Sequence, residues 1–322
     1  MSLYAFDGTW NSAVVDDGEE GEDDTNVVLF FDAYQGRKWY VSGPGTRLGK
    51  LGKAVGGFMG AGARERVEEA YTQLCADYAA GDTTIDIVGF SRGAAIALDF
   101  ANLINDRGIR DSATDAVIAN NVSIRFLGLW DVVGSFGIPV GEQLFQKINL
   151  GHTLSVPENV EYAFHALAMD DRRQSFRPTR QLQAYEVWFR GVHSDVGGGN
   201  GNTGLSCIAL RWMLCKAQAA GLPIDAAAIE ARSGKMNPDA PLCLPKDLIE
   251  NAPREFWPGD LIHYSATDRS GHNNAPANYP RETRADELRA VARASLPPRT
   301  PRQPPAHPPG DSEHLSRVRV DD

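Results

Sequence analysis

The sequence has few cysteines, no excess of positive charge and no long run of apolar residues. Its four cysteines, Cys75, Cys207, Cys215 and Cys243, form no Cys-x-x-Cys pair, which argues against a zinc site or a disulfide framework and favours buried thiols. The formal net charge is -10 at pH 7, whereas proteins that bind nucleic acids need a concentrated basic surface. We therefore expect no nucleic-acid partner and no cysteine-bound metal.

Targeting and membrane segments are also missing. No apolar stretch approaches the length of a membrane-spanning helix. The N-terminus has no basic segment, and Asp7 interrupts its short apolar run, so we expect no Sec signal peptide and no transmembrane segment. The protein would then be made in the cytoplasm, and export would need a machine that ignores signal peptides.

The overall composition is that of a folded globular protein, with 42% hydrophobic and 23% charged residues in a chain of 322. We expect one large catalytic domain over residues 1–295. Within it, 223–258 lacks clear periodicity and is interpreted as a small cap or an excursion over the site. The chain becomes rich in proline after Leu296, so 296–322 is predicted to be a disordered tail.

Apolar runs alternate with segments of helical spacing. Strands are predicted at the short apolar runs 3–6, 85–88, 122–130 and 185–189. Helices are predicted where apolar residues recur at helical spacing, over 64–78, 94–104 and 205–213. This alternation is typical of an α/β fold whose mostly parallel, doubly wound sheet has helices on both faces and binds ligands at the carboxyl ends of its strands.

Ser91 lies between a predicted strand and a predicted helix, within Gly89-Phe90-Ser91-Arg92-Gly93. A Gly-x-Ser-x-Gly turn at such a junction is so tight that small residues must flank the serine, and it lifts the hydroxyl clear of the sheet. This is the nucleophile elbow of α/β-hydrolases. The pattern therefore predicts that Ser91 is a nucleophile.

A serine nucleophile needs a base, and the base needs a carboxylate that orients it. Among the seven histidines, His193 is the best placed, because it follows a predicted strand in a glycine-rich loop. Asp131 is the first polar residue after a hydrophobic strand. The order Ser91, Asp131, His193 is that of α/β-hydrolases. Two alternatives stay open: Asp195 in place of Asp131, and His263 in place of His193.

Attack on an ester produces an oxyanion that needs backbone N–H donors. The residue after the nucleophile, Arg92, supplies the first, and Gly8 or Thr9 in an early strand-end loop could supply the second. The alternative is that Asp7-Gly8-Thr9 is a simple tight turn stabilised by the aspartate side chain. The sequence does not decide between them.

Several motifs also occur in one characteristic order: Phe6-Asp7-Gly8-Thr9-Trp10-Asn11, Thr25-Asn26-Val27, Gly43-Pro44-Gly45-Thr46, Gly89-Phe90-Ser91-Arg92-Gly93-Ala94, Trp130-Asp131-Val132-Val133-Gly134, His165-Ala166-Leu167-Ala168-Met169-Asp170 and Gly191-Val192-His193-Ser194-Asp195-Val196-Gly197-Gly198-Gly199. With this combination the sequence, over roughly residues 3 to 270, resembles the α/β-hydrolase family that includes the first class of type VI secretion lipase effectors. Several ordered motifs are far more specific than any single one.

The resemblance implies hydrolysis of carboxyl esters by a lipase or A-type phospholipase, with phospholipids as the substrates of the antibacterial members. By motif it assigns the nucleophile to Ser91, the acid to Asp131 and the base to His193. An acyl-enzyme on Ser91 needs no metal and no cofactor. The resemblance also implies an immunity protein or a component of the secretion machine as partners.

Two other functions compete with this interpretation. Phe6-Asp7-Gly8-Thr9 resembles the nucleophile loop of haloacid-dehalogenase-like phosphatases, which would make the protein a metal-assisted phosphohydrolase that uses Asp7. That loop normally has a second aspartate where this sequence has Thr9. The other is a catalytically inactive hydrolase fold that serves as an interaction module.

Overall fold

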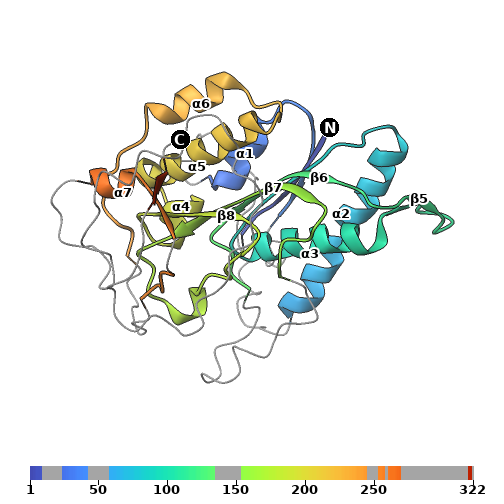
Figure 1. Ribbon diagram of the computed structural model, residues 1–322, viewed down its shortest axis with the longest axis horizontal. Helices are drawn as coiled ribbons and strands as arrows, with labels where there is room; N and C mark the ends of the chain where they lie inside the picture. Colours follow the sequence, from blue (N-terminus) through green and yellow to red (C-terminus); the bar gives the residue numbers. More distant parts are fainter. Residues whose placement is uncertain are drawn as a thin grey trace.

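A parallel sheet forms the centre of the molecule (Figure 1). The computed structural model describes residues 1–8, 24–42, 58–134, 154–244, 253–257, 260–269 and 318–320. Within them the sheet has eight strands in the order β10-β9-β8-β7-β6-β3-β1-β2, and each neighbouring pair is parallel. Its strands are β1 (Ser2–Phe6), β2 (Arg37–Val41), β3 (Ile85–Phe90), β6 (Ile124–Trp130), β7 (Val160–Ala168), β8 (Tyr185–Phe189), β9 (Leu261–His263) and β10 (Val318–Val320).

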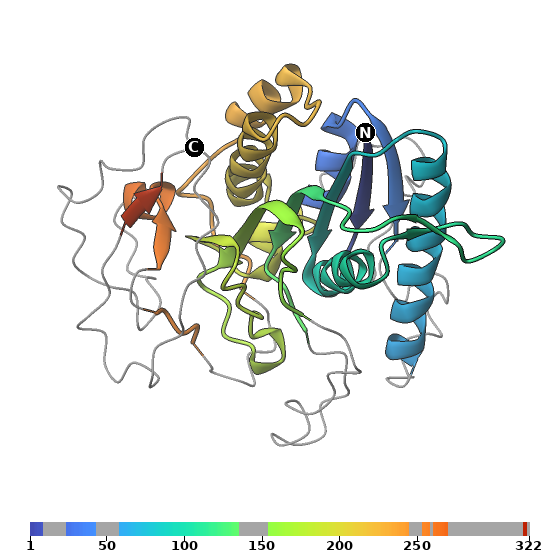
Figure 2. The same ribbon diagram turned by 45° about the vertical axis from the view of Figure 1, so that its right-hand side comes forward.

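Helices cover both faces of this sheet, which confirms the predicted doubly wound fold (Figures 1 and 2). One face carries α1 (Asn26–Ala33) and α5 (Thr203–Ala219), with α6 (Ala226–Ser233) packed on α5, and the other carries α2 (Phe58–Ala79) and α3 (Ser91–Arg107). The short elements are α4 (His193–Gly197), α7 (Ser265–Asp268), the 3-10 turn η2 (Gln174–Phe176) and an antiparallel hairpin of β4 (Ile109–Arg110) and β5 (Val117–Ala119). No helix among the described residues is long and apolar enough to cross a membrane.

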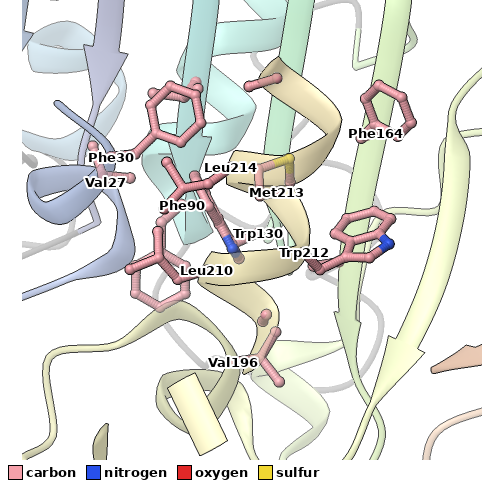
Figure 3. Close-up of a cluster of buried hydrophobic side chains, with 14 of the residues drawn as sticks. Val27, Phe30, Phe90, Trp130, Phe164, Val196, Leu210, Trp212, Met213 and Leu214 are labelled. Atoms are coloured by element: carbon pink, nitrogen blue, oxygen red, sulfur yellow. The ribbon is translucent and has the colours of Figure 1, made fainter. Parts of the chain in front are cut away.

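Three apolar cores occur among the described residues, and the two larger ones, on opposite faces of the sheet, explain why the strands read as nearly continuous apolar runs. Successive side chains of a strand point to opposite faces of the sheet. In β1, Leu3 and Ala5 enter the core beneath α1 and α5, whereas Tyr4 and Phe6 enter the core beneath α2 and α3. Figure 3 shows the first core, where Trp212 of α5 lies among apolar side chains from the strands. Every residue of β1 and β3, the two strands between these cores, is therefore buried.

The strand order places the candidate residues together. The chain moves from β1 outward to β2, then returns to β3 on the other side of β1 and continues through β6, β7 and β8. In open α/β sheets, ligands bind in the crevice at the carboxyl ends of strands near such a reversal. Ser91 follows β3, Asp131 follows β6 and His193 follows β8 closely, so all three lie at this edge.

Some predictions for the remaining segments need comment. The predicted cap over 223–258 contains α6, which packs on α5, and the described residues 253–257, which reach Asp131. Of the tail predicted to be disordered, 296–322, the structure describes only Val318–Val320, which form β10 beside β9, and the rest lies outside the described residues. β2 and β7 were not predicted, because charged or polar residues interrupt their apolar runs.

Candidate active site

Ser91 occupies a strained turn between β3 and α3. Its φ is 59°, in the left-handed region that residues with a side chain rarely adopt. Strain of this kind persists only where the surroundings enforce it, and it concentrates at functional sites. Its carbonyl accepts a hydrogen bond from the N–H of Val133 at 3.2 Å. The turn directs the Ser91 hydroxyl toward His193, and the geometry is that of the predicted elbow.

The two glycines of the elbow are required by close packing. A Cβ on Gly93 would lie 2.3 Å from the carbonyl oxygen of Asp7, and a Cβ on Gly89 would lie 2.7 Å from the Cα of Ala94. Real Cβ atoms essentially never approach backbone so closely. Helix α3 can therefore start this near to β1 and β3 only because both positions lack side chains.

A continuous hydrogen-bonded chain joins Ser91, His193 and Asp131. His193 Nε2 lies 2.7 Å from Ser91 Oγ, and His193 Nδ1 lies 2.6 Å from Asp131 Oδ2. A carboxylate only accepts hydrogen bonds, so Nδ1 carries the proton and Nε2 is left to accept from the serine hydroxyl. All three side chains are buried. The structure thus brings together the three residues that the sequence selected.

The charge states of Asp131 and His193 are those of a base paired with an ionised carboxylate. Burial alone would raise the pKa of Asp131, but the charge of Arg254 and the hydrogen bond from His193 outweigh it and lower the pKa to about 2. Burial lowers the pKa of His193 below its ordinary value, against the opposing effect of Asp131. At neutral pH, Asp131 is therefore ionised and His193 is neutral.

Aromatic rings and a second carboxylate hold His193 in place. The ring of Phe90 lies 4.6 Å from the imidazole, centroid to centroid, and Phe176 meets it edge-on at 4.9 Å. The backbone N–H of His193 donates to Asp171 Oδ2 at 3.1 Å. Asp171 is itself gripped by Arg173, whose Nη2 lies 2.6 Å from the same oxygen. These contacts restrict the imidazole to the orientation that serves Ser91.

Asp131 is supported from beneath by a buried polar network. Its φ of 38° is also in the left-handed region. The next residue, Val132, donates its N–H to His165 Nε2 at 3.1 Å, so His165 carries its proton on Nδ1, which lies 3.0 Å from Glu186 Oε1. Glu186 is paired in turn with Arg180 at 2.8 Å. This network fixes the turn that presents the Asp131 carboxylate.

Asp7, the proposed nucleophile of the phosphohydrolase alternative, has both carboxylate oxygens engaged. Oδ1 accepts the N–H of Gly8 at 2.6 Å, and Oδ2 accepts the hydroxyls of Thr25 at 2.8 Å and Tyr40 at 2.6 Å. Asn26, the residue after Thr25, donates a hydrogen bond from its side-chain amide to the carbonyl of Val196 at 2.8 Å, and Val196 lies in the same short helix as His193. Asp7 therefore holds the segment Thr25–Asn26, which is hydrogen-bonded to the loop that carries His193.

The two alternative triad members lie in other settings. Asp195 accepts the N–H of Val192 at 3.0 Å and that of Cys243 at 3.1 Å, and Asn200 and Asn202 donate to its other oxygen. It therefore organises the glycine-rich loop, whereas Asp131 contacts the imidazole.

His263 is buried beside β8. Its Nδ1 lies 2.8 Å from Ser265 Oγ, and its ring stacks on that of Phe189 at 4.7 Å. The imidazole nitrogen at the Ser91 hydroxyl belongs to His193 instead.

Of the predicted oxyanion donors, Arg92 holds the expected place, directly after Ser91 at the start of α3. The Gly8 N–H donates to Asp7 Oδ1 and would serve an oxyanion only by leaving this bond. That hydrogen bond is the one expected for the alternative that the sequence left open, a tight turn stabilised by the aspartate side chain. Thr9 lies outside the described residues.

Two residues of the site were not anticipated. Arg254 contacts Asp131 from a proline-flanked segment without periodicity, and no sequence signal marks it. Asp171 directly follows the motif His165-Ala166-Leu167-Ala168-Met169-Asp170. Its place as an acidic residue after an apolar segment was the signal by which the sequence could have indicated it.

The chain matches the family described as type VI secretion system, phospholipase effector Tle1-like, catalytic domain, over residues 3–119 and 110–216, together about two thirds of its length. No curated protein matches it. An uncharacterized protein from Pseudomonas aeruginosa is similar in structure, with 22% identity, a TM-score of 0.48, and coverage of 72% of this chain and 48% of that one.

The Tle1 effector bound to the VgrG spike of the type 6 secretion system is also similar, with 21% identity and a TM-score of 0.42. That match covers 62% of this chain and 50% of the effector chain. The chain thus spans about half the length of each of these two proteins.

The elbow glycines generate a stability prediction. Gly93→Ala should lower the free energy of unfolding by about 1–3 kcal/mol, because its Cβ forces α3 away from β1. Gly234→Ala is the matched control, since nothing lies within 4 Å of its Cβ position and its φ is -69°. Urea denaturation of both variants checks this. A Gly93→Ala protein as stable as the control would contradict the packing argument.

Proposed function

The chain belongs to the catalytic-domain family of Tle1-like phospholipase effectors of type VI secretion, and on this premise we propose that it is a serine hydrolase that cleaves phospholipid carboxyl esters. The observation that carries the proposal is the hydrogen-bonded chain from Ser91 Oγ through His193 to Asp131. It supplies a nucleophile, a neutral base and a buried carboxylate in the arrangement that acyl transfer requires.

In the first half-reaction, Ser91 Oγ attacks the ester carbonyl carbon while His193 Nε2 takes the hydroxyl proton. Asp131 stabilises the imidazolium that forms. The Arg92 N–H and the positive end of α3, which begins at Ser91, face the developing oxyanion. The tetrahedral intermediate then collapses, the imidazolium protonates the leaving glycerol oxygen, and the acyl group stays on Ser91.

In the second half-reaction, a water molecule replaces the alcohol. His193 takes a proton from the water, whose oxygen attacks the acyl-enzyme carbonyl. Collapse of this second intermediate expels Ser91 Oγ, which recovers its proton from the imidazolium, and releases a fatty acid. Ser91, His193, the leaving alcohol and water account for every proton in the cycle, and no step uses a metal or cofactor.

The choice of phospholipid rests on the family, because the hydrogen-bonded chain alone would serve any carboxyl ester. Family membership likewise supports delivery by a type VI secretion machine after synthesis in the cytoplasm. A component of that machine and an immunity protein are the partners that fit this role.

Replacing the nucleophile tests the proposal. Ser91→Ala should reduce fatty-acid release from phosphatidylethanolamine–phosphatidylglycerol vesicles by at least about 10⁴-fold. Ser123→Ala is the control, since this exposed serine precedes β6 at the amino end of the sheet. Wild-type activity should survive a chelator. Release that persists in Ser91→Ala, or that the chelator abolishes, would contradict the mechanism, and a wild-type protein inactive on every ester would favour the interaction module.

The two candidate histidines should differ sharply. His193→Ala should lose at least about 10⁴-fold in kcat on a soluble short-chain ester, because no other imidazole nitrogen is hydrogen-bonded to Ser91 among the described residues. His263→Ala should keep its kcat and lose about 1–3 kcal/mol of stability, because its ring is buried against Phe189. Loss of turnover in His263→Ala alone would show that His193 is not the base.

The pH dependence follows from the charge states. Burial lowers the pKa of His193, so kcat/KM should rise with pH through a midpoint below about 6.5 and then level off. Asp131, with a pKa of about 2, stays ionised over this range. Steady-state kinetics on a soluble ester measures the midpoint. A midpoint well above 6.5 would be incompatible with a buried neutral imidazole as the base.

A further inference from the structure

Arg254 makes contact with Asp131 from a part of the chain that the family match does not include. We propose that Arg254 is a positioning residue for the proposed hydrolysis, fixing the Asp131 carboxylate and extending the action of His193 as a base to lower pH. This inference rests on the proposed function, and its test separates the two.

The guanidinium reaches three acceptors around Asp131. Arg254 Nη2 lies 3.0 Å from Oδ2, the oxygen that also accepts from His193, and Nη1 lies 3.4 Å from Oδ1. Arg254 Nε donates to the carbonyl of Asp171 at 3.2 Å. The Ala168 N–H donates to Oδ1 at 3.0 Å. Both oxygens of Asp131 are therefore held from more than one side, which prevents the carboxylate from turning away from the imidazole.

Arg254 is itself held rigidly. Its exposed fraction is 2%. The ring of nearby Phe256 lies 4.7 Å from that of Trp188 in β8, and the N–H of Trp257 donates to Asp260 Oδ2 at 2.8 Å. The segment 253–257 is thus pinned to the sheet beside the site. The guanidinium is therefore already in place before the reaction begins. Its electrostatic effect on Asp131 and His193 needs no rearrangement of the protein during the reaction.

The match to the catalytic-domain family ends at residue 216, whereas Arg254 lies beyond it. A segment outside the matched region therefore supplies a contact to the candidate acid. The site depends on a part of the chain that the family assignment alone would leave out.

The charges that face His193 predict the effect of removing this arginine. Asp131 after β6 and Asp171 after β7 favour the imidazolium, and Arg254 opposes it. Arg173 is bound to Asp171, and Asp195, on the same short helix as His193, is bound by loop amides. Loss of the Arg254 charge leaves both carboxylates facing the imidazole, so the protonated form gains stability and the pKa of His193 rises.

Charge and shape can be separated at this position. A lysine keeps the positive charge but lacks the planar fork that contacts both oxygens of Asp131 and the Asp171 carbonyl. Arg254→Lys should therefore keep the pH midpoint of wild type and lose about 10-fold or more in kcat. Arg254→Gln should lose kcat and also move the midpoint.

The experiment compares wild type, Arg254→Gln, Arg254→Lys and the control Arg177→Gln. Arg177 lines the same pocket as Arg254 but is 50% exposed and pairs with Glu255. Two readouts are taken: the pH dependence of kcat/KM on a soluble ester, and the NMR titration of the His193 imidazole in a Ser91→Ala background, which needs no turnover. Arg254→Gln should raise both midpoints by about one pH unit, and the control should leave both unchanged.

A folded Arg254→Gln protein with unchanged midpoints would overturn the inference, even if kcat falls, because a merely structural role would produce that result. If Arg254→Gln does not fold, Arg254→Lys decides: wild-type kcat in that variant, or a kcat that falls together with the free energy of unfolding, overturns the positioning role. A reduced kcat at an unchanged midpoint, KM and free energy of unfolding supports it. If the wild type is inactive on every ester and Arg254→Gln still raises the titration midpoint of the His193 imidazole, the proposed function alone is refuted. An active wild type without the shift would refute the role of Arg254 alone.

Discussion

The buried, ionised carboxylate of Asp131 is the constraint on which the rest of the site depends. An unpaired charge in a protein interior costs several kcal/mol, so this carboxylate must be surrounded by donors. The donors come from segments far apart in the chain: the Ala168 N–H at the end of β7, His193 after β8, and Arg254 in 253–257. Satisfying one carboxylate therefore brings these segments together, and the imidazole between Asp131 and Ser91 is oriented as a consequence.

The sheet supplies the place where this convergence occurs. Parallel strands deliver Ser91 and Asp131 to one edge, where both adopt left-handed backbone angles that only tight surroundings can maintain. The glycines at 89 and 93 allow α3 to begin against β1 and β3, so that its positive end faces the site of the proposed oxyanion. Packing in the two larger apolar cores thus fixes the positions on which the chemistry relies.

Much of this arrangement could be predicted from the sequence. Ser91, Asp131 and His193 follow apolar runs long enough to identify as strands, and parallel strands end at a common edge. The sequence favoured Asp131 but left Asp195 open, because the choice depends on which carboxylate faces the imidazole in space.

Arg254 was beyond prediction, since its segment has no periodicity and its contacts arise only when the chain folds. The hydrogen bond from the Gly8 N–H to Asp7 was one of two alternatives that the sequence left open, and only the structure could decide between them. The most direct test of the central claim is mass spectrometry of the protein quenched during turnover of a slowly deacylated ester. The account predicts one acyl group on the peptide that contains Ser91, and none when His193 is replaced by alanine. An acyl group on another residue, or turnover without any adduct under conditions that trap known acyl-enzymes, would contradict it.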